Sequence, residues 1–153
     1  MQRVVREQRL GFVATVTPDG MPNLSPKGTT TVWDDSHLMF ADICSPNTIR
    51  NLASNPNVEV NVVDPIVPKG YRFRGVASVH AGDETYERGL AILRDLGSTT
   101  PRERFHHIVV IEVTDAAALV SPAYDMPDAT EAAIAERWLA RVEDLHGVHR
   151  VTR

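Results

Sequence analysis

The sequence of 153 residues contains a single cysteine, Cys44, and only two lysines, Lys27 and Lys69. One cysteine excludes a disulfide within the chain and a zinc site built from several cysteines. No apolar run approaches the roughly 18 residues of a membrane-spanning helix, and residues 1–10 lack the apolar core of a signal peptide. We therefore expect a cytoplasmic protein without a membrane partner.

Clusters of basic residues are also missing. The formal net charge is −4 at pH 7, whereas a protein that binds nucleic acid usually presents a cationic face to the phosphates. We therefore expect no nucleic-acid partner. The chain length and the 42% content of hydrophobic residues suit one domain, residues 1–153, with a core that needs no disulfide or metal.

The residues that are present predict a mainly β fold with peripheral helices. β-branched residues and alternating apolar residues indicate six strands, and most of these follow one another through short turns, as in an antiparallel barrel. The predicted strands are residues 11–17, 24–33, 38–41, 58–63, 71–81 and 104–113. The predicted helices are residues 1–10, 46–54, 83–97 and 128–145, the last of which follows a barrel core of about residues 10–120.

The start of the helix at residues 46–54 is a candidate phosphate site. Ser45 precedes Pro46, a residue that suits the first helical position, so Ser45 is the predicted N-cap. The first N–H groups of a helix lack an intrahelical acceptor and carry partial positive charge, which favours an anion. Lys27 would add a full charge if the preceding hairpin folds back. The alternative is that Ser45 is only a cap and Lys27 only the solvated end of a strand.

Five segments carry a resemblance to a known family through their order and spacing. They are residues 10–16 (LGFVATV), 19–23 (DGMPN), 25–28 (SPKG), 40–42 (FAD) and 48–56 (TIRNLASNP). Over about residues 10–120 the chain resembles the pyridoxamine 5′-phosphate oxidase-like family of FMN-binding split barrels, in particular its general-stress-protein-like members. The resemblance implies a six-stranded antiparallel split β-barrel of the FMN-binding type.

The resemblance also implies a cofactor, FMN, and a homodimer with FMN at its interface. It assigns phosphate or ribityl contacts to one group of residues and contacts with the isoalloxazine edge to another. The first group is Lys27, Ser45, Asn47, Thr48 and Asn51, and the second is Ser25, Pro26 and Gly28. Arg72 belongs either to a solvated strand face or to the interface and flavin phosphate, and Tyr124 is predicted to reach the flavin of the partner.

The sequence departs from the vitamin-making oxidases of the family. These enzymes carry a basic side chain near the position of Thr48, an arginine at the start of the strand that leads to Lys27, and substrate residues in a C-terminal extension. None of these has a counterpart here. The resemblance therefore implies an FMN-dependent oxidoreductase that acts on another small substrate. The alternatives are a flavin-binding or redox-sensing protein without turnover, and a split barrel that binds a deazaflavin or haem.

No catalytic acid or base and no metal site are predicted. His106 and His107 are consecutive on a predicted strand, so their side chains point to opposite faces and cannot bind one metal together. His146 and His149 could face the same way on a helix, but the sequence offers no third ligand nearby.

Overall fold

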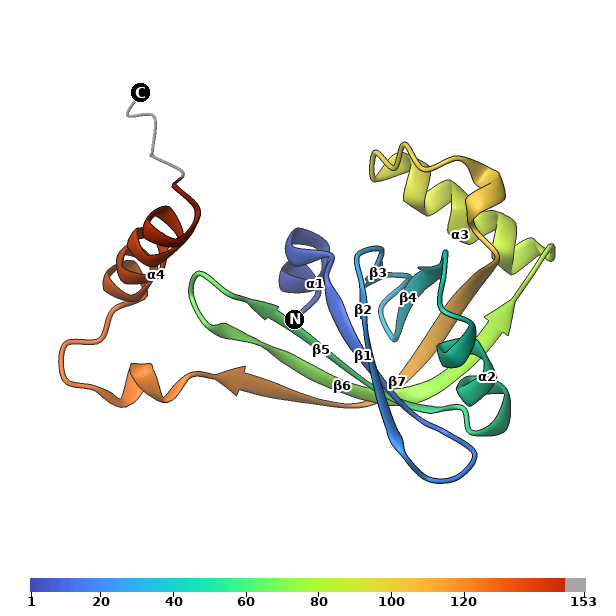
Figure 1. Cartoon of the computed structure of the whole chain (residues 1–153), viewed down its shortest axis with the longest axis horizontal. Helices are drawn as coiled ribbons and strands as arrows, with labels where there is room; N and C mark the ends of the chain where they lie inside the picture. The colour runs from blue at the N-terminus through green and yellow to red at the C-terminus, as the bar shows by residue number, and fades with distance from the viewer. Residues whose placement is uncertain (148–153) are drawn as a thin grey trace.

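The computed structural model describes residues 1–147 and shows one curled antiparallel sheet with helices around it (Figure 1). The sheet has the strand order β2-β1-β5-β6-β7-β4-β3 within the described residues. The mainly β split barrel is confirmed, but the predicted count of six strands is wrong, because there are seven. The strands are β1 (Gly11–Val16), β2 (Pro22–Lys27), β3 (Thr31–Val32), β4 (His37–Asp42), β5 (Asn57–Asp64), β6 (Lys69–His80) and β7 (His107–Val120). The α-helices are α1 (Gln2–Gln8), α2 (Pro46–Ser54), α3 (Glu84–Asp95) and α4 (Glu131–His146).

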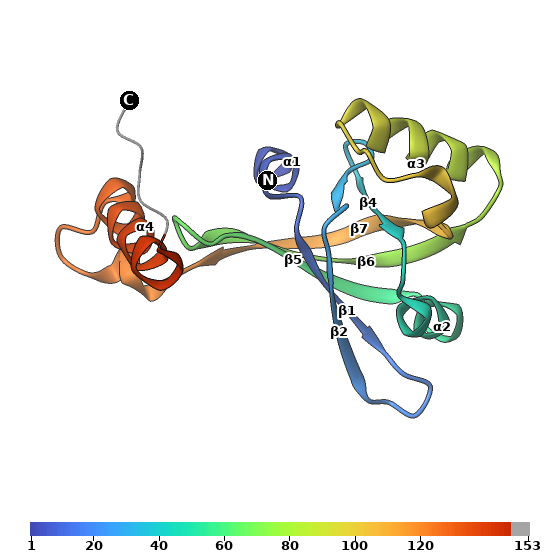
Figure 2. The same cartoon turned by 45° about the horizontal axis from the view of Figure 1, so that its top comes forward.

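The seventh strand arises because the segment predicted as one strand, residues 24–33, is divided after Lys27. The carbonyl oxygen of Lys27 accepts the Thr30 N–H at 3.3 Å and the Thr30 hydroxyl at 2.9 Å. A threonine hydroxyl that bonds nearby backbone competes with a strand ladder. β2 and β3 consequently lie at opposite edges of the sheet, joined by only residues 28–30. So short a connection requires the two edges to curl toward each other (Figure 2).

The predicted strand at residues 104–113 is also corrected, because β7 begins at His107 and extends to Val120. β7 pairs with β6 along its whole length, from His80↔Ile108 to Lys69↔Val120. Pairing with a neighbouring strand therefore overrides the low strand propensity of the alanines at positions 116–118. The register shifts between Arg74 and Gly75. A Cβ at Gly75 would lie 2.2 Å from the carbonyl oxygen of Glu112, so this close approach requires glycine.

β4 separates two apolar clusters. Leu38 and Phe40 point into the barrel, where Phe40 is fully buried, whereas Met39 and Ala41 face the cluster beneath α3. This alternation follows from the two-residue period of a strand. β4 is consequently buried on both faces, and Asp42 at its end is drawn into the protein interior.

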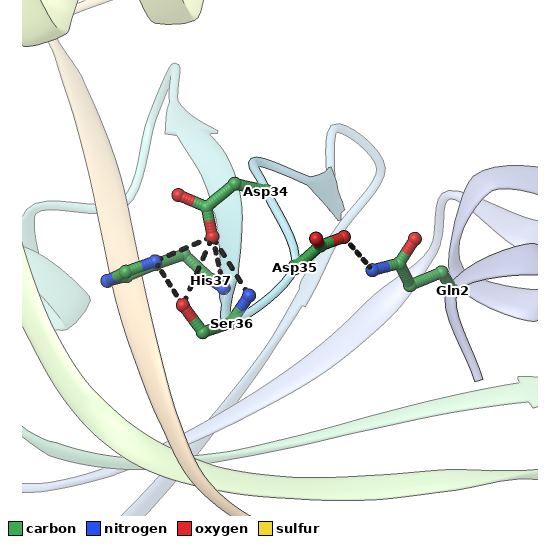
Figure 3. Close-up of polar contacts among 5 residues, drawn as sticks. All are labelled: Gln2, Asp34, Asp35, Ser36 and His37. Carbon is green, nitrogen blue, oxygen red and sulfur yellow. Dashed lines mark hydrogen bonds and ion pairs between the residues drawn. The ribbon is translucent and has the colours of Figure 1, made fainter.

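The turn predicted at residues 34–36 is confirmed and centres on Asp34 (Figure 3). Its Oδ1 accepts the backbone N–H groups of Ser36 and His37, each at 2.9 Å, as expected of an aspartate that closes its own turn. The Gln2 amide donates to Asp35 at 3.2 Å. This bond ties α1 to the β3–β4 turn.

The C-terminal segment extends from the far end of β7 and carries α4 away from the barrel (Figure 1). Thr130 is the N-cap of α4, with its hydroxyl accepting the Ala133 N–H at 3.1 Å. The segment is attached through Tyr124, which donates to the carbonyl oxygen of Val67 at 2.7 Å, and through Ile134, which is 1% exposed. Residues 121–146 therefore form an arm, the name used below. No helix within residues 1–147 is long and apolar enough to cross a membrane.

Candidate functional site

Lys27 is a buried lysine beside the start of α2. Its side chain lies at the end of β2, is 5% exposed, and donates to the hydroxyls of Ser25, at 2.7 Å, and Ser45. The ammonium nitrogen also lies 5.7 Å from the centre of the Phe40 ring. The end of β2 therefore lies next to the start of α2, although Lys27 is not part of the β3–β4 hairpin, and its burial excludes the alternative that Lys27 is a solvated strand end.

The charge of Lys27 has no close carboxylate partner among residues 1–147. Burial lowers the pKa of Lys27 from its usual value, and the negative charge of the nearby Asp42 opposes that shift. An ammonium group has three N–H donors, and two of them already bond Ser25 and Ser45. One donor is left for a ligand.

Asp42 organises the other side of the helix start. Its carboxyl group is 3% exposed; Oδ1 accepts the Ser45 N–H at 2.8 Å and Oδ2 accepts from His107 Nδ1 at 2.9 Å. Sequence reasoning assigned neither residue a role, because His107 is 65 residues away and meets Asp42 only through the β4–β7 pairing. The available signal was an acidic residue directly after the apolar run of β4.

An open depression of about 510 Å³ lies next to this cluster. Its volume falls within the range of about 300 to 1,000 Å³ that is usual for small-molecule sites. Ser45 lines the depression and also contacts Lys27, so the two features are continuous. The remaining lining residues are Asp42, Ile43, Cys44, Pro46, Ile49, Arg50, His106 and His107.

The residues predicted on α2 are divided between the surface and the interior. Asn47 is exposed and accepts from Arg50 at 3.2 Å, whereas Thr48 and Asn51 are each 2% exposed. The Asn51 amide donates to the Thr15 hydroxyl at 3.0 Å, inside the barrel wall. The side chains of Thr48 and Asn51 are thus directed into the protein and do not line the depression.

Ser45 occupies the predicted N-cap position, but its hydroxyl makes no capping hydrogen bond and accepts from Lys27 instead. Ser25 belongs to the Lys27 cluster, and Pro26 and Gly28 are exposed beside it. Arg72 and Tyr124 make their contacts elsewhere. Arg72 pairs with Glu59 at 3.1 Å, and the Tyr124 ring lies 4.0 Å from the Lys69 ammonium nitrogen.

This arrangement fits a bound phosphate. The third donor of Lys27 and the Ser45 hydroxyl lie at the helix start, and Arg50 lines the adjoining depression. The first-turn N–H groups of Asn47 and Thr48 have no intrahelical acceptor. An anion placed there would also pair with the buried charge of Lys27, which has no carboxylate within ion-pair distance among residues 1–147.

Within residues 1–147, no group of three or more His, Cys, Asp or Glu side chains is placed to hold a metal ion. His149, the second member of the histidine pair noted in the sequence, lies outside the described residues.

Comparison with solved structures supports the fold. HupZ from Group A Streptococcus is 28% identical, with a TM-score of 0.68 over 79% of this chain and 92% of that chain. An F420 reductase is 28% identical, with a TM-score of 0.62 over 76% of this chain and 94% of that chain. An FMN-binding protein from Syntrophomonas wolfei is 13% identical, with a TM-score of 0.65 over 78% of this chain and 84% of that chain.

No curated protein matches the chain. The family model described as pyridoxamine 5′-phosphate oxidase matches residues 1–118. This range contains all but the last two residues of the sheet, together with the Lys27 cluster and the residues that line the depression. The resemblance noted from the sequence is therefore confirmed, and the chain belongs to the pyridoxamine 5′-phosphate oxidase family.

Proposed function

We propose that this protein binds FMN at the start of α2 and acts as an oxidoreductase on a small substrate. The observation that carries the proposal is the buried ammonium group of Lys27, which contacts two hydroxyls and lies beside a depression of about 510 Å³. Bound FMN would supply the two-electron chemistry. The protein would supply the phosphate contacts and the orientation of the cofactor.

The electrostatics of the cluster favour an anionic ligand. A buried charge is unfavourable unless it is paired, and Asp42, the nearby carboxylate, is already bonded to His107 and to the Ser45 N–H. A phosphate group would pair with Lys27 and accept its remaining N–H. Bonds of this charge-assisted kind are the strong ones in proteins.

We also propose a homodimer with the flavin at the interface between its subunits. Large apolar side chains, among them Phe12, Val16 and Leu24, are exposed on the outer face of β1 and β2. An exposed apolar face of this kind is typical of an interaction surface. In such a dimer Arg72 or Tyr124 of one subunit would contact the flavin held by the other. A mass near 16.9 kDa, that of one chain, measured by light scattering of the flavin-loaded protein would contradict the dimer.

The decisive test uses FMN and riboflavin, which differ only in the phosphate. The protein freed of cofactor is titrated with each, and FMN is expected to bind more tightly than riboflavin. Equal affinities for FMN and riboflavin would show that the protein has no phosphate site. Denaturing release and mass spectrometry of the cofactor that copurifies separate FMN from the alternatives.

A deazaflavin is the second candidate, because the F420 reductase is among the similar structures. Haem is a third, because His106 lies before β7 and not on it, contrary to the strand predicted from the sequence, and both His106 and His107 line the depression. A flavin-loaded protein that oxidises and reduces no substrate would instead be a flavin-binding or redox-sensing protein.

A further inference from the structure

A second group of chemically active side chains lies outside the proposed flavin site, where β6 leads into α3. The Ser78 hydroxyl lies 2.8 Å from His80 Nε2, and His80 Nδ1 lies 2.9 Å from Asp83 Oδ2. Ser78 and His80 are two residues apart on β6 and therefore share one face of the strand. Asp83 is the N-cap of α3. A strand and a helix end thus hold the three side chains in line.

Asp83 is fixed as a charged hydrogen-bond acceptor. Its Oδ1 accepts the Tyr86 N–H at 2.7 Å, while Oδ2 accepts from His80. These bonds, with the Tyr86 N–H contributing most, lower the pKa of Asp83 from its usual value. An ionised Asp83 places the His80 ring proton on Nδ1, so that Nε2 can accept the proton of Ser78. This is the order of contacts that activates a serine nucleophile.

The β3–β4 turn contains the same three residue types without this order (Figure 3). There the Asp34 carboxylate, at 2.7 Å, and the Ser36 hydroxyl, at 3.1 Å, both meet Nδ1 of His37. In a serine–histidine–aspartate triad the aspartate contacts one ring nitrogen and the serine the other. In the turn both contacts are to Nδ1, so His37 cannot accept the Ser36 proton while Asp34 orients the ring. The turn therefore provides a control inside the same protein.

The surroundings of Ser78 suit a small acyl group on an open surface. Ser78 and its neighbour on the same strand face, Val76, are both exposed. The Ala77 N–H donates to the carbonyl oxygen of Pro56 at 2.8 Å, on the β5 side of β6 and just before the first residue of β5, Asn57. Alternate residues of a strand point their N–H groups to the same side, so the Val79 N–H points to this side, beyond the part of β6 that pairs with β5. It is available to a developing oxyanion next to Ser78.

We propose that Ser78, His80 and Asp83 form a hydrolytic site for carboxylic esters with a short apolar acyl group. Ser78 Oγ attacks the carbonyl carbon while its proton passes to His80 Nε2. The same proton goes to the alcohol oxygen as the C–O bond breaks and the alcohol leaves. Water, deprotonated by His80, then cleaves the acyl–Ser78 bond, and the proton returns to Ser78 as the acid is released. Ser78 and His80 are the catalytic residues, and Asp83 is a positioning residue.

The test uses the full chain, a fluorophosphonate probe and p-nitrophenyl acetate. We expect one phosphonate per chain, located on Ser78 by peptide mass spectrometry, and ester hydrolysis that S78A lowers about a hundredfold. S36A, the matched control in the β3–β4 turn, should retain both the phosphonate label and the ester hydrolysis. Absence of label from the wild-type protein, label at another residue, or equal hydrolysis by S78A would overturn the proposal.

Two further variants separate catalysis from structure. H80Q should lose label and hydrolysis together; a loss in H80Q with S78A unaffected would indicate a free imidazole base and contradict the serine nucleophile. Asn caps helices as well as Asp does, so D83N should keep its melting temperature while label incorporation falls. D83E, which restores the carboxylate, should regain part of the labelling. Unchanged labelling in D83N would show that Asp83 does not position His80.

Discussion

The two lysines of this protein lie in regions that shift the pKa of an ammonium group in opposite directions. Lys27 is buried beside α2, and burial lowers its pKa. Lys69, at the start of β6, has a partly exposed side chain, and its hydrogen bond to Glu131 at 2.9 Å raises its pKa. Lys69 joins the arm to the sheet through a carboxylate partner of its own. Among residues 1–147, Lys27 contacts two hydroxyls and the Phe40 ring but has no carboxylate within ion-pair distance, so its region can accept an anion from elsewhere.

The difference shows which lysine is structural and which is available to a ligand. An ion pair at the protein surface, such as Lys69–Glu131, adds little to stability because solvent screens the two charges. A buried ammonium without a carboxylate lowers stability until an anion binds. A protein that keeps such a group gains ligand affinity at a cost in stability.

The largest expected effect is a loss of stability on substitution of Thr48, a polar residue that α2 buries. T48E places a carboxylate in the protein interior, and an unpaired buried charge costs about 3–5 kcal/mol. The free energy of unfolding, measured in urea, should fall by that amount. N47E, its neighbour at the exposed position, should change little. A T48E protein that is stable but no longer binds FMN would instead place position 48 in contact with the phosphate.

The second prediction compares the two lysines as ligands. K27M should weaken FMN binding roughly tenfold to a hundredfold, because a hydrogen bond to a charged group contributes about 1.5–3 kcal/mol. K69M should leave the FMN affinity unchanged. Fluorescence titration of both variants checks the contrast, and equal losses would show that Lys27 has no special role.

Local residue patterns predicted much of the region that holds Lys27. The turn at residues 34–36 and the Pro46 start of α2 follow from short-range chemistry. The contact between Lys27 and Ser45, 18 positions apart, was expected only if the chain folds back. The burial of Thr48 and Asn51 could have been read from helix geometry, since residues i, i+3 and i+4 share one face and Leu52 marks the buried one. Their amide and hydroxyl groups instead suggested a surface site.

Long-range contacts account for the rest. The Asp42–His107 pair and the Lys69–Glu131 bond join residues 65 and 62 positions apart. Each depends on how the strands pair or on where the arm returns. The extension of β7 to Val120 likewise depends on its partner β6. No local pattern encodes these pairings.

The third prediction concerns the attachment of the arm. E131Q removes the charge partner of Lys69 and should leave the global free energy of unfolding nearly unchanged, because solvent screens a surface ion pair. Local opening of the arm should increase, because Lys69–Glu131 and the Tyr124–Val67 bond are among the few polar contacts that attach it. Limited proteolysis should therefore cleave residues 121–130 sooner in E131Q than in the wild type. Cleavage within the barrel at the same rate would contradict a separately opening arm.

The smallest expected effect is a difference between Lys27 and Lys69 in how their contributions to stability change with pH in the alkaline range. The folded-state pKa of Lys27 is lowered, so between that value and the usual 10.5 the unfolded chain binds more protons. The contribution of Lys27 to stability should then rise with pH through this window and level off above it. The pKa of Lys69 is raised, so its smaller contribution is present below 10.5 and is lost as the pH passes its folded-state value. Urea unfolding between about pH 8 and about pH 11, with K27M and K69M each subtracted from the wild type, isolates the two slopes because other groups cancel. If the free energy of unfolding changed with pH in the same direction for both lysines, the two would share one kind of environment. Bound FMN should flatten the pH slope of Lys27 alone, because it holds the proton of Lys27 in place.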